Sequence, residues 1–139
     1  DLSAGLAYGL SVPVALAAPW LIRLAYGAAY AEAAPVLALH IWSSVFVFLG
    51  VARSQFLVNE RFMRFYLVAT LAGAGLNVLL NFWLIPREGA WGAAVATVAA
   101  QAVAAWLSSF CFAPVRATAW MQTRALLIPV RWFPYVRRA

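Results

Sequence analysis

The sequence predicts an all-α integral membrane protein with four transmembrane helices. Three observations predict this class. The composition is too apolar for a water-soluble surface, four apolar runs have membrane-spanning length, and the arginines gather on one side of those runs. Each is set out below, followed by the polar residues that could carry function.

The composition excludes a soluble domain. Hydrophobic residues make up 66% of the 139 positions and charged residues 10%, with a mean hydropathy of +0.86. A soluble domain carries about 25% charged residues. The net charge of +6 comes from arginines that flank apolar runs, so it does not indicate nucleic-acid binding. The single cysteine, Cys111, excludes an internal disulfide and a cysteine-based metal site.

Each apolar run is close to the roughly 20 residues that cross a bilayer core. The four runs cover residues 2–24, 34–57, 65–85 and 90–112, and short charged connections separate them. Residues 113–139 form a basic, aromatic tail in which Pro129 and Pro134 preclude a fifth spanning helix. This tail suits the surface of an anionic inner leaflet. The chain starts without Met and without a signal peptide, so we expect a fragment of a longer protein.

Arginine placement sets the direction of the four helices. Arg23 lies at the outer end of the first run, and Arg87 lies in the third connection on the same side. The other arginines lie on the opposite side of the predicted bundle, at positions 53, 61, 64, 116, 124, 131, 137 and 138. The positive-inside rule places that arginine-rich side in the cytoplasm. Both chain ends are therefore expected in the cytoplasm.

Asn77 and Asn81 are polar residues inside the third apolar run. Because they are four positions apart, they share one helix face, and a buried amide in hydrocarbon needs a hydrogen-bond partner. The pair predicts either an interhelical hydrogen bond that fixes packing or the lining of a polar cavity or gate. For the packing role we expect Asn81→Ala, nearer the Pro86 turn, to lower the folded yield more than Asn77→Ala.

Arg53, with Gln55 nearby, lies inside the second run close to its cytoplasmic end. One interpretation is an arginine that extends to the lipid headgroups. The other is a cavity arginine that binds a phosphate of a substrate, because a planar guanidinium binds phosphate through two hydrogen bonds. Both Arg53 and Gln55 are therefore candidates for a substrate cavity.

His40 is the one histidine, and it lies in the second run. It is either a packing donor or, if it titrates, a group for proton coupling. The carboxylates Asp1, Glu32, Glu60 and Glu88 are scattered over the chain end and the connections. No paired carboxylates, glycine-rich phosphate loop or His/Cys cluster occurs. The sequence therefore predicts no enzyme, no metal site and no cofactor.

Three segments carry a family resemblance. The most specific spans the third and fourth runs and consists of Asn77, Asn81, Pro86, Gly89, Gly92 and Thr97. The other two are residues 19–30, with a Tyr-Gly pair at 26–27, and residues 50–60. Together they resemble the oligosaccharide flippase branch, including O-antigen flippases, of the multidrug/oligosaccharidyl-lipid/polysaccharide (MOP) exporter superfamily. The resemblance covers about residues 3–112.

The resemblance implies an all-helical transporter with a dozen or more helices in two lobes. Members of the family turn lipid-diphosphate-linked oligosaccharides across the bacterial inner membrane by alternating access, for export of polysaccharides such as lipopolysaccharide. This chain would match the last four helices of the carboxy-terminal lobe. Its partners would be the lipid-linked oligosaccharide, membrane lipids and the amino-terminal lobe of the same protein.

Three alternatives remain open at this point. One is a multidrug or other lipid exporter of the same superfamily, although no acidic residue lies deep in a predicted span. Another is a membrane-embedded glycan polymerase, which needs catalytic groups gathered in an exposed loop. The last is a non-transporting assembly subunit, which has no need of asparagines and an arginine inside its spans.

Overall fold

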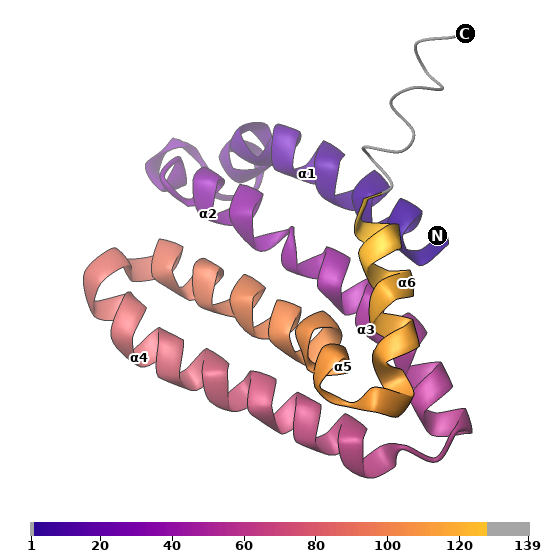
Figure 1. Ribbon diagram of the computed structural model, residues 1–139. Helices are drawn as coiled ribbons and strands as arrows, with labels where there is room; N and C mark the ends of the chain where they lie inside the picture. The colour runs from indigo at the N-terminus through magenta and orange to yellow at the C-terminus, as the bar shows by residue number, and fades with distance from the viewer. Residues whose placement is uncertain (1, 128–139) are drawn as a thin grey trace, which may run out of the picture.

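The protein is an all-α chain (Figure 1). The computed structural model describes residues 2–127. The longer helices are α1 (Leu2–Tyr26), α2 (Ala33–His40), α3 (Ser43–Asn59), α4 (Met63–Ala102) and α6 (Arg116–Leu126). Shorter elements lie between them: the 3-10 helices η1 (Ala28–Tyr30) and η3 (Ala113–Val115), the π-helix η2 (Val103–Leu107) and the single-turn helix α5 (Ser108–Cys111).

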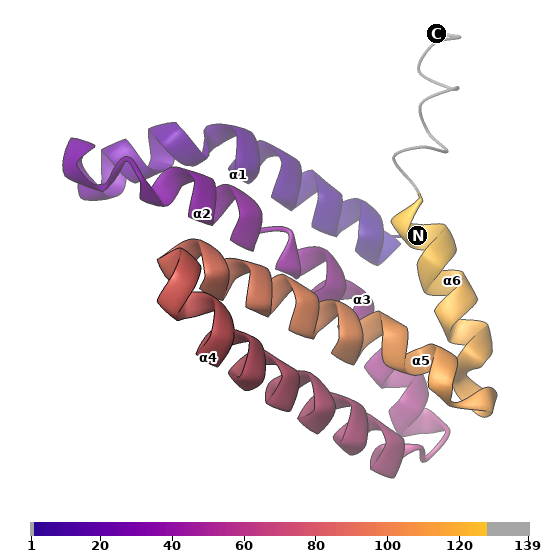
Figure 2. The same ribbon diagram turned by 60° about the vertical axis from the view of Figure 1, so that its left-hand side comes forward.

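Four antiparallel rods build the molecule. α1 forms the first, and α2 with α3 forms the second. α4, continued by η2 and α5, supplies the other two, because the chain reverses at Gly89, whose φ of 55° and ψ of −133° lie outside the helical region. We term residues 63–88 the first arm and residues 90–111 the second arm. The amino terminus, the α3–α4 connection and α6 lie at one end, and the α1–α2 connection and the reversal lie at the other (Figures 1 and 2).

Three helical stretches are long and apolar enough to cross a membrane: Leu2–Tyr26, Ala33–Asn59 and Met63–Cys111. The first two agree closely with the runs expected at 2–24 and 34–57. The third contains both runs expected at 65–85 and 90–112, with Gly89 between them. The prediction of an all-α fold built on long apolar helices is therefore confirmed.

Small side chains fill the interior, and large apolar side chains face outward. Eleven of the sixteen buried hydrophobic residues are alanines. Phe82 and Leu16, by contrast, are 86% and 79% exposed. Large apolar side chains are usually inside a water-soluble protein. An interior of small residues is typical of membrane helices, whose backbones approach closely through them.

Two glycines permit the closest approaches within the α4 hairpin. A Cβ atom added at Gly73 would lie 2.5 Å from Ala104 Cβ and 3.1 Å from Ala100 O. A Cβ atom added at Gly92 would lie 2.7 Å from Leu84 O, next to the reversal. Both positions have no room for a side chain, so the two arms pack at a separation that glycine sets.

The second rod is not one uninterrupted helix. A turn at Ile41 and Trp42 separates α2 from α3 inside the run that was expected to be a single span. Ser11 of α1 packs against this turn, with its Oγ 3.3 Å from Ile41 O and 2.8 Å from Ser44 Oγ. No Pro or Gly marks the interruption in the sequence, so the apolar pattern did not predict it.

α6 closes the end of the bundle at which the chain starts. Gln122 Nε2 donates to Leu49 O of α3 at 3.1 Å and to Ala105 O of η2 at 2.9 Å. Tyr8 Oη of α1 donates to Leu126 O at 2.8 Å. α6 therefore joins three elements that are far apart in the sequence.

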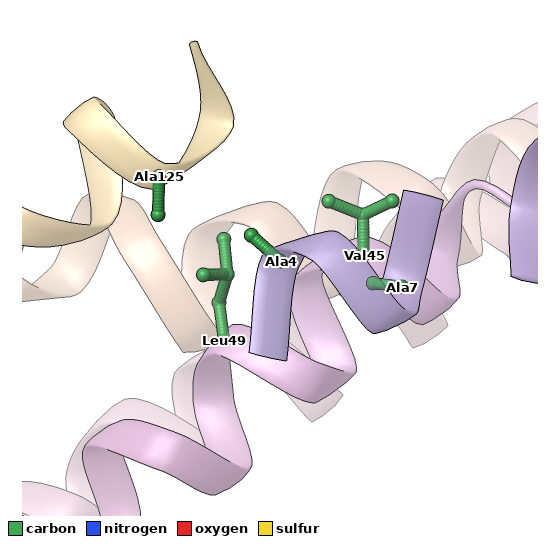
Figure 3. Packing of buried hydrophobic residues seen from close by; sticks show 5 residues of the cluster. All are labelled: Ala4, Ala7, Val45, Leu49 and Ala125. Carbon is green, nitrogen blue, oxygen red and sulfur yellow. The ribbon is translucent and has the colours of Figure 1, made fainter. Parts of the chain in front are cut away.

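A hydrophobic cluster supports the same junction (Figure 3). It brings together Ala4, Ala7, Val45, Leu49 and Ala125. The first part of the tail expected at 113–139 is thus a helix packed on the bundle. Residues 128–139, which include Pro129, Pro134 and three arginines of that tail, lie outside the described residues.

A matched pair of glycine variants tests the packing of the hairpin. Gly73→Ala should destabilise the protein by roughly 1–3 kcal/mol, because the new methyl group overlaps Ala104. Gly75→Ala should be neutral or stabilising by up to about 1 kcal/mol, because no atom lies within 4 Å of its Cβ position and Ala favours helix. Thermal unfolding of the full-length protein in detergent measures both. Equal effects of the two variants would contradict the close packing at Gly73.

Candidate functional site

A buried arginine defines the candidate site. Arg53 lies in the second half of α3 and is 4% exposed. An arginine that extends to lipid headgroups does not fit this burial. The side chain instead crosses from α3 to the second arm, where its partners follow Ala102 in the chain.

Three neutral groups hold the guanidinium of Arg53. Nη1 donates to Ser109 Oγ at 2.6 Å and to Ser108 Oγ at 2.9 Å. Nη2 donates to Ala104 O at 2.6 Å. The Cζ atom also lies 5.8 Å from the centre of the Phe65 ring, which adds a cation–π contact. None of these groups carries a negative charge.

The positive charge of Arg53 therefore has no acidic partner among residues 2–127. The carboxylates in that part of the chain are Glu32, Glu60 and Glu88, and all three are exposed at connections. A buried charge is costly unless it is paired or fully hydrogen-bonded. Three hydrogen bonds reduce that cost for Arg53, but the local charge of +1 remains available to an anion.

The π-helix η2 shapes the backbone where Arg53 binds. Ser108 N–H donates to Val103 O, five residues back, in place of the usual four. Ala104 O, inside this turn, accepts from both Arg53 Nη2 and Ser108 Oγ. Single π-turns of this kind are frequent at functional sites because they alter the pairing of backbone groups. Here the altered turn places a carbonyl and two hydroxyl groups around one guanidinium.

Within residues 2–127, two of the five N–H groups of Arg53 make no hydrogen bond. A guanidinium carries one N–H on Nε and two on each Nη. The hydrogen bonds to Ser108, Ser109 and Ala104 use three of them. Nε is buried and has no partner, and Nη2 has one N–H left. Free N–H groups on neighbouring nitrogens are the arrangement with which arginine binds phosphate or carboxylate through two bonds.

Two hollows border Arg53 on different sides of α3. The first, of about 220 Å³, lies between α3 and the two arms of α4, and we call it the polar hollow. Besides Arg53, its lining includes the polar side chains of Ser54, Tyr66, Thr70 and Gln101. Hydroxyl and amide groups beside a cation can bind a polar, anionic molecule.

The second hollow, of about 180 Å³, lies between α1, α3 and α6, and we call it the α6 hollow. Its lining is largely apolar and includes Leu49, Phe56 and Met121 together with Arg53 and Gln122. Arg53 is thus shared between a polar space on one side and an apolar space on the other.

The structure brings together only part of the predicted site. Gln55 is exposed and lines neither hollow, so it does not join Arg53. His40 is exposed at the end of α2, and Asn77 and Asn81 lie in the hairpin, away from both hollows. Within residues 2–127, no group of three His, Cys, Asp or Glu side chains is placed to hold a metal ion.

The two asparagines form a short hydrogen-bonded chain within the hairpin. Asn81 Nδ2 donates to Asn77 Oδ1 at 2.8 Å. Asn77 Nδ2 in turn lies 3.5 Å from Thr97 Oγ1 of the second arm. In the part of the chain that the structure describes, Asn81 Oδ1 is buried and has no hydrogen-bond partner. The contact between the arms therefore comes from Asn77, whereas Asn81 only supports it.

Sequence reasoning missed the residues that hold Arg53. Ser108 and Ser109 form the one pair of adjacent hydroxyl residues in the fourth run, and that polar pair was the available signal. Gln122 was also missed, because it lies in the segment that was expected to rest on the leaflet surface. These residues come from regions 55 to 70 positions away from Arg53 in the sequence.

Comparison with known proteins leaves the family of this chain open. No protein-family model, no curated protein and no solved structure matches it. What the site does is therefore inferred from its residues and their contacts.

The hydrogen bonds of the hairpin reverse the expected ranking of the asparagine variants. Asn77→Ala removes two contacts, one of them between the arms, and should cost on the order of 1 kcal/mol. Asn81→Ala removes one contact within an arm and also removes a buried oxygen without a partner, so it should cost less. Thermal unfolding in detergent gives both values. A larger loss for Asn81→Ala would restore the ranking expected from the sequence.

Proposed function

We propose that this chain is the carboxy-terminal four-helix part of a membrane transporter that flips lipid-diphosphate-linked oligosaccharide across the bacterial inner membrane. The single observation that carries the proposal is Arg53, a buried cation with two free N–H groups and no acidic partner among the described residues. A diphosphate is an anion that fits this fork. The residue resemblance to oligosaccharide flippases supports the same substrate.

Membrane placement is supported by the exposed surface. Three apolar helical stretches have spanning length, and the third reverses at Gly89, which gives four crossings. Large apolar side chains face outward along these stretches, where lipid would cover them. In this proposal the chain is a multi-pass protein of the inner membrane.

The orientation follows from the charges at the two ends of the rods. Among the described residues, Arg61, Arg64, Arg116 and Arg124 lie at the end that holds the amino terminus and α6, whereas Arg23 and Arg87 lie toward the other. The positive-inside rule then places both chain ends in the cytoplasm. Arg53 lies toward the cytoplasmic end, the side from which a lipid-linked oligosaccharide would be loaded.

The polar hollow offers partners for the glycan next to the diphosphate. Tyr66 and Thr70 of the first arm and Gln101 of the second arm line it together with Arg53. Sugar hydroxyl groups both donate and accept hydrogen bonds, as these side chains do. In the proposed transporter, the amino-terminal lobe would complete the cavity over this face, and alternating access would expose it to each side in turn.

The alternatives differ from the proposal in what they need from Arg53. A multidrug exporter of the same superfamily that moves cations would be repelled by an unpaired arginine. An exporter of another anionic lipid would use the arginine in the same way, so the substrate must be decided by assay. A glycan polymerase needs catalytic groups gathered in an exposed loop, and an assembly subunit has no need of a buried cation.

Substitution of Arg53 in the full-length protein tests the proposed function. Arg53→Ala should abolish flipping, because it removes the charge and both free N–H groups. Arg53→Lys should keep a part of the activity, since lysine retains the charge and loses the fork. The assay is surface glycan in cells that lack their own flippase, with the amount of each variant checked by blot.

A matched control separates this role from a general effect of charge. Arg64→Ala removes an exposed arginine at the same end of the bundle and should leave surface glycan unchanged. Normal surface glycan from a well-expressed Arg53→Ala variant would reduce Arg53 to a structural residue. If Arg53→Ala fails to accumulate, the surface glycan of Arg53→Lys is compared with that of wild type. This comparison tests the phosphate contact, because the lysine variant keeps a buried cation but not the phosphate fork.

A further inference from the structure

α6 turns polar side chains inward and large apolar side chains outward. Thr118 and Gln122 are buried against the bundle. Trp120 and Met121 are 60% and 61% exposed, and Leu127, which caps the helix, is also exposed. A helix on the surface of a water-soluble protein has the opposite pattern, with its apolar stripe buried. The pattern of α6 indicates that its outward face lies in an apolar environment rather than in water.

The inward face of α6 is occupied by contacts with the rest of the bundle. Gln122 Nε2 donates to Leu49 O of α3 and to Ala105 O of η2. Thr123 Oγ1 accepts from Trp106 Nε1 at 3.0 Å. These polar contacts explain why α6 directs its amide and hydroxyl groups inward. Its apolar outward face needs a different explanation.

The length and direction of α6 place it along one side of a bilayer. α6 has 11 residues, which gives a length of about 16 Å, whereas a bilayer core is about 30 Å thick. It crosses the rods obliquely, near the end at which the chain starts (Figures 1 and 2). In the orientation proposed above, this end faces the cytoplasm. The outward face of α6 would then meet the inner leaflet.

Charge identifies the kind of lipid that fits this face. Arg116, Trp120 and Arg124 follow one another at intervals of four residues, so they form one stripe along the helix, and all three are exposed. Residues 103–127 contain no Asp or Glu that could balance the two arginines. An apolar face that carries an indole and two cations is typical of a helix in contact with anionic headgroups.

We infer that the outward face of α6 binds anionic phospholipid of the inner leaflet, and that this lipid stabilises the junction of α6 with α1, α3 and η2. Phosphate oxygens accept from Arg116 and Arg124, while Trp120 and Met121 lie against the upper part of the acyl chains. Lipid bound to the folded helix stabilises the folded state by mass action. The inference rests on the membrane placement proposed above, and it does not require that the protein flips oligosaccharide.

A spin label on the outward face tests its environment in the full-length protein. The protein would be reconstituted into vesicles of phosphatidylethanolamine and phosphatidylglycerol, with its native cysteines replaced by Ser. A label at Met121→Cys should collide more often with oxygen than with a water-soluble nickel chelate. Glu60→Cys, in the exposed α3–α4 connection, should show the reverse order.

The other outcomes at Met121 would overturn the inference. More frequent collision with the nickel chelate would show that the face is in water. Collision with neither reagent would show that a protein segment covers it. Should Met121→Cys fail to accumulate, Ala117→Cys gives the same measurement, because Ala117 is exposed one turn earlier on the same face.

Lipid-dependent unfolding tests the charge of the bound lipid. Phosphatidylglycerol should raise the Tm of the full-length protein in neutral detergent more than phosphatidylcholine does. The double variant Arg116→Gln, Arg124→Gln should lose this difference, because each substitution should weaken phosphatidylglycerol binding about fivefold. The control Arg23→Gln, Arg87→Gln removes the same charge toward the other end of the rods and should keep the difference.

Three results of the unfolding experiment would overturn the inference. They are equal Tm values in the two lipids for wild type, the same loss in both double variants, and an unchanged difference in Arg116→Gln, Arg124→Gln. Soluble glycerol 3-phosphate should not raise the Tm, and stabilisation equal to that by phosphatidylglycerol would show that a free phosphate ester binds instead of a lipid. The readout is unfolding rather than transport, so its failure is distinguishable from failure of the Arg53 assay.

Discussion

The hydrogen bonds from Arg53 to η2 and α5 of the second arm are the constraint on which the rest of the structure depends. A guanidinium buried between helices needs acceptors within about 3 Å on more than one side. Ser108, Ser109 and Ala104 O meet that need. They can do so because η2 departs from α-helical pairing where Arg53 arrives. The bonds also set the register of α3 against the second arm, and the polar hollow lies along that contact.

Close helix packing follows from the same constraint. The helices around Arg53 must pack closely to keep lipid away from its charge. The sequence provides Ala and Gly at their contacts. Gly73 lets the first arm approach the turn that holds Arg53, since Ala104 lies opposite it. Gln122 of α6 ties α3 to η2 one turn of α3 away from Arg53. The polar contacts of Arg53 and Gln122 thus lie near the end that holds α6.

Local features of the fold could be predicted from the sequence, whereas contacts between distant segments could not. The long apolar runs and the reversal between Pro86 and Gly92 were predicted, because length, hydropathy and turn residues are local properties. Arg53 was recognised because a cation in an apolar run is unusual. Its partners Ser108 and Ser109 were not predicted, because nothing in the sequence shows which distant donor will bind a hydroxyl group in an apolar run. The turn at Ile41 was missed for a similar reason: Ser11, which packs on it, belongs to another helix.

A double-mutant cycle between Arg53 and Ser109 tests most directly whether the buried cation organises the bundle. Arg53→Met, Ser109→Ala and the double variant of the full-length protein would be unfolded in detergent, and the three changes in free energy compared with wild type. A hydrogen bond from a charged donor to a fully buried hydroxyl predicts a coupling energy of about 1.5–3 kcal/mol. A coupling energy within about 0.5 kcal/mol of zero is the range found for independent sites, and it would contradict the role given to Arg53.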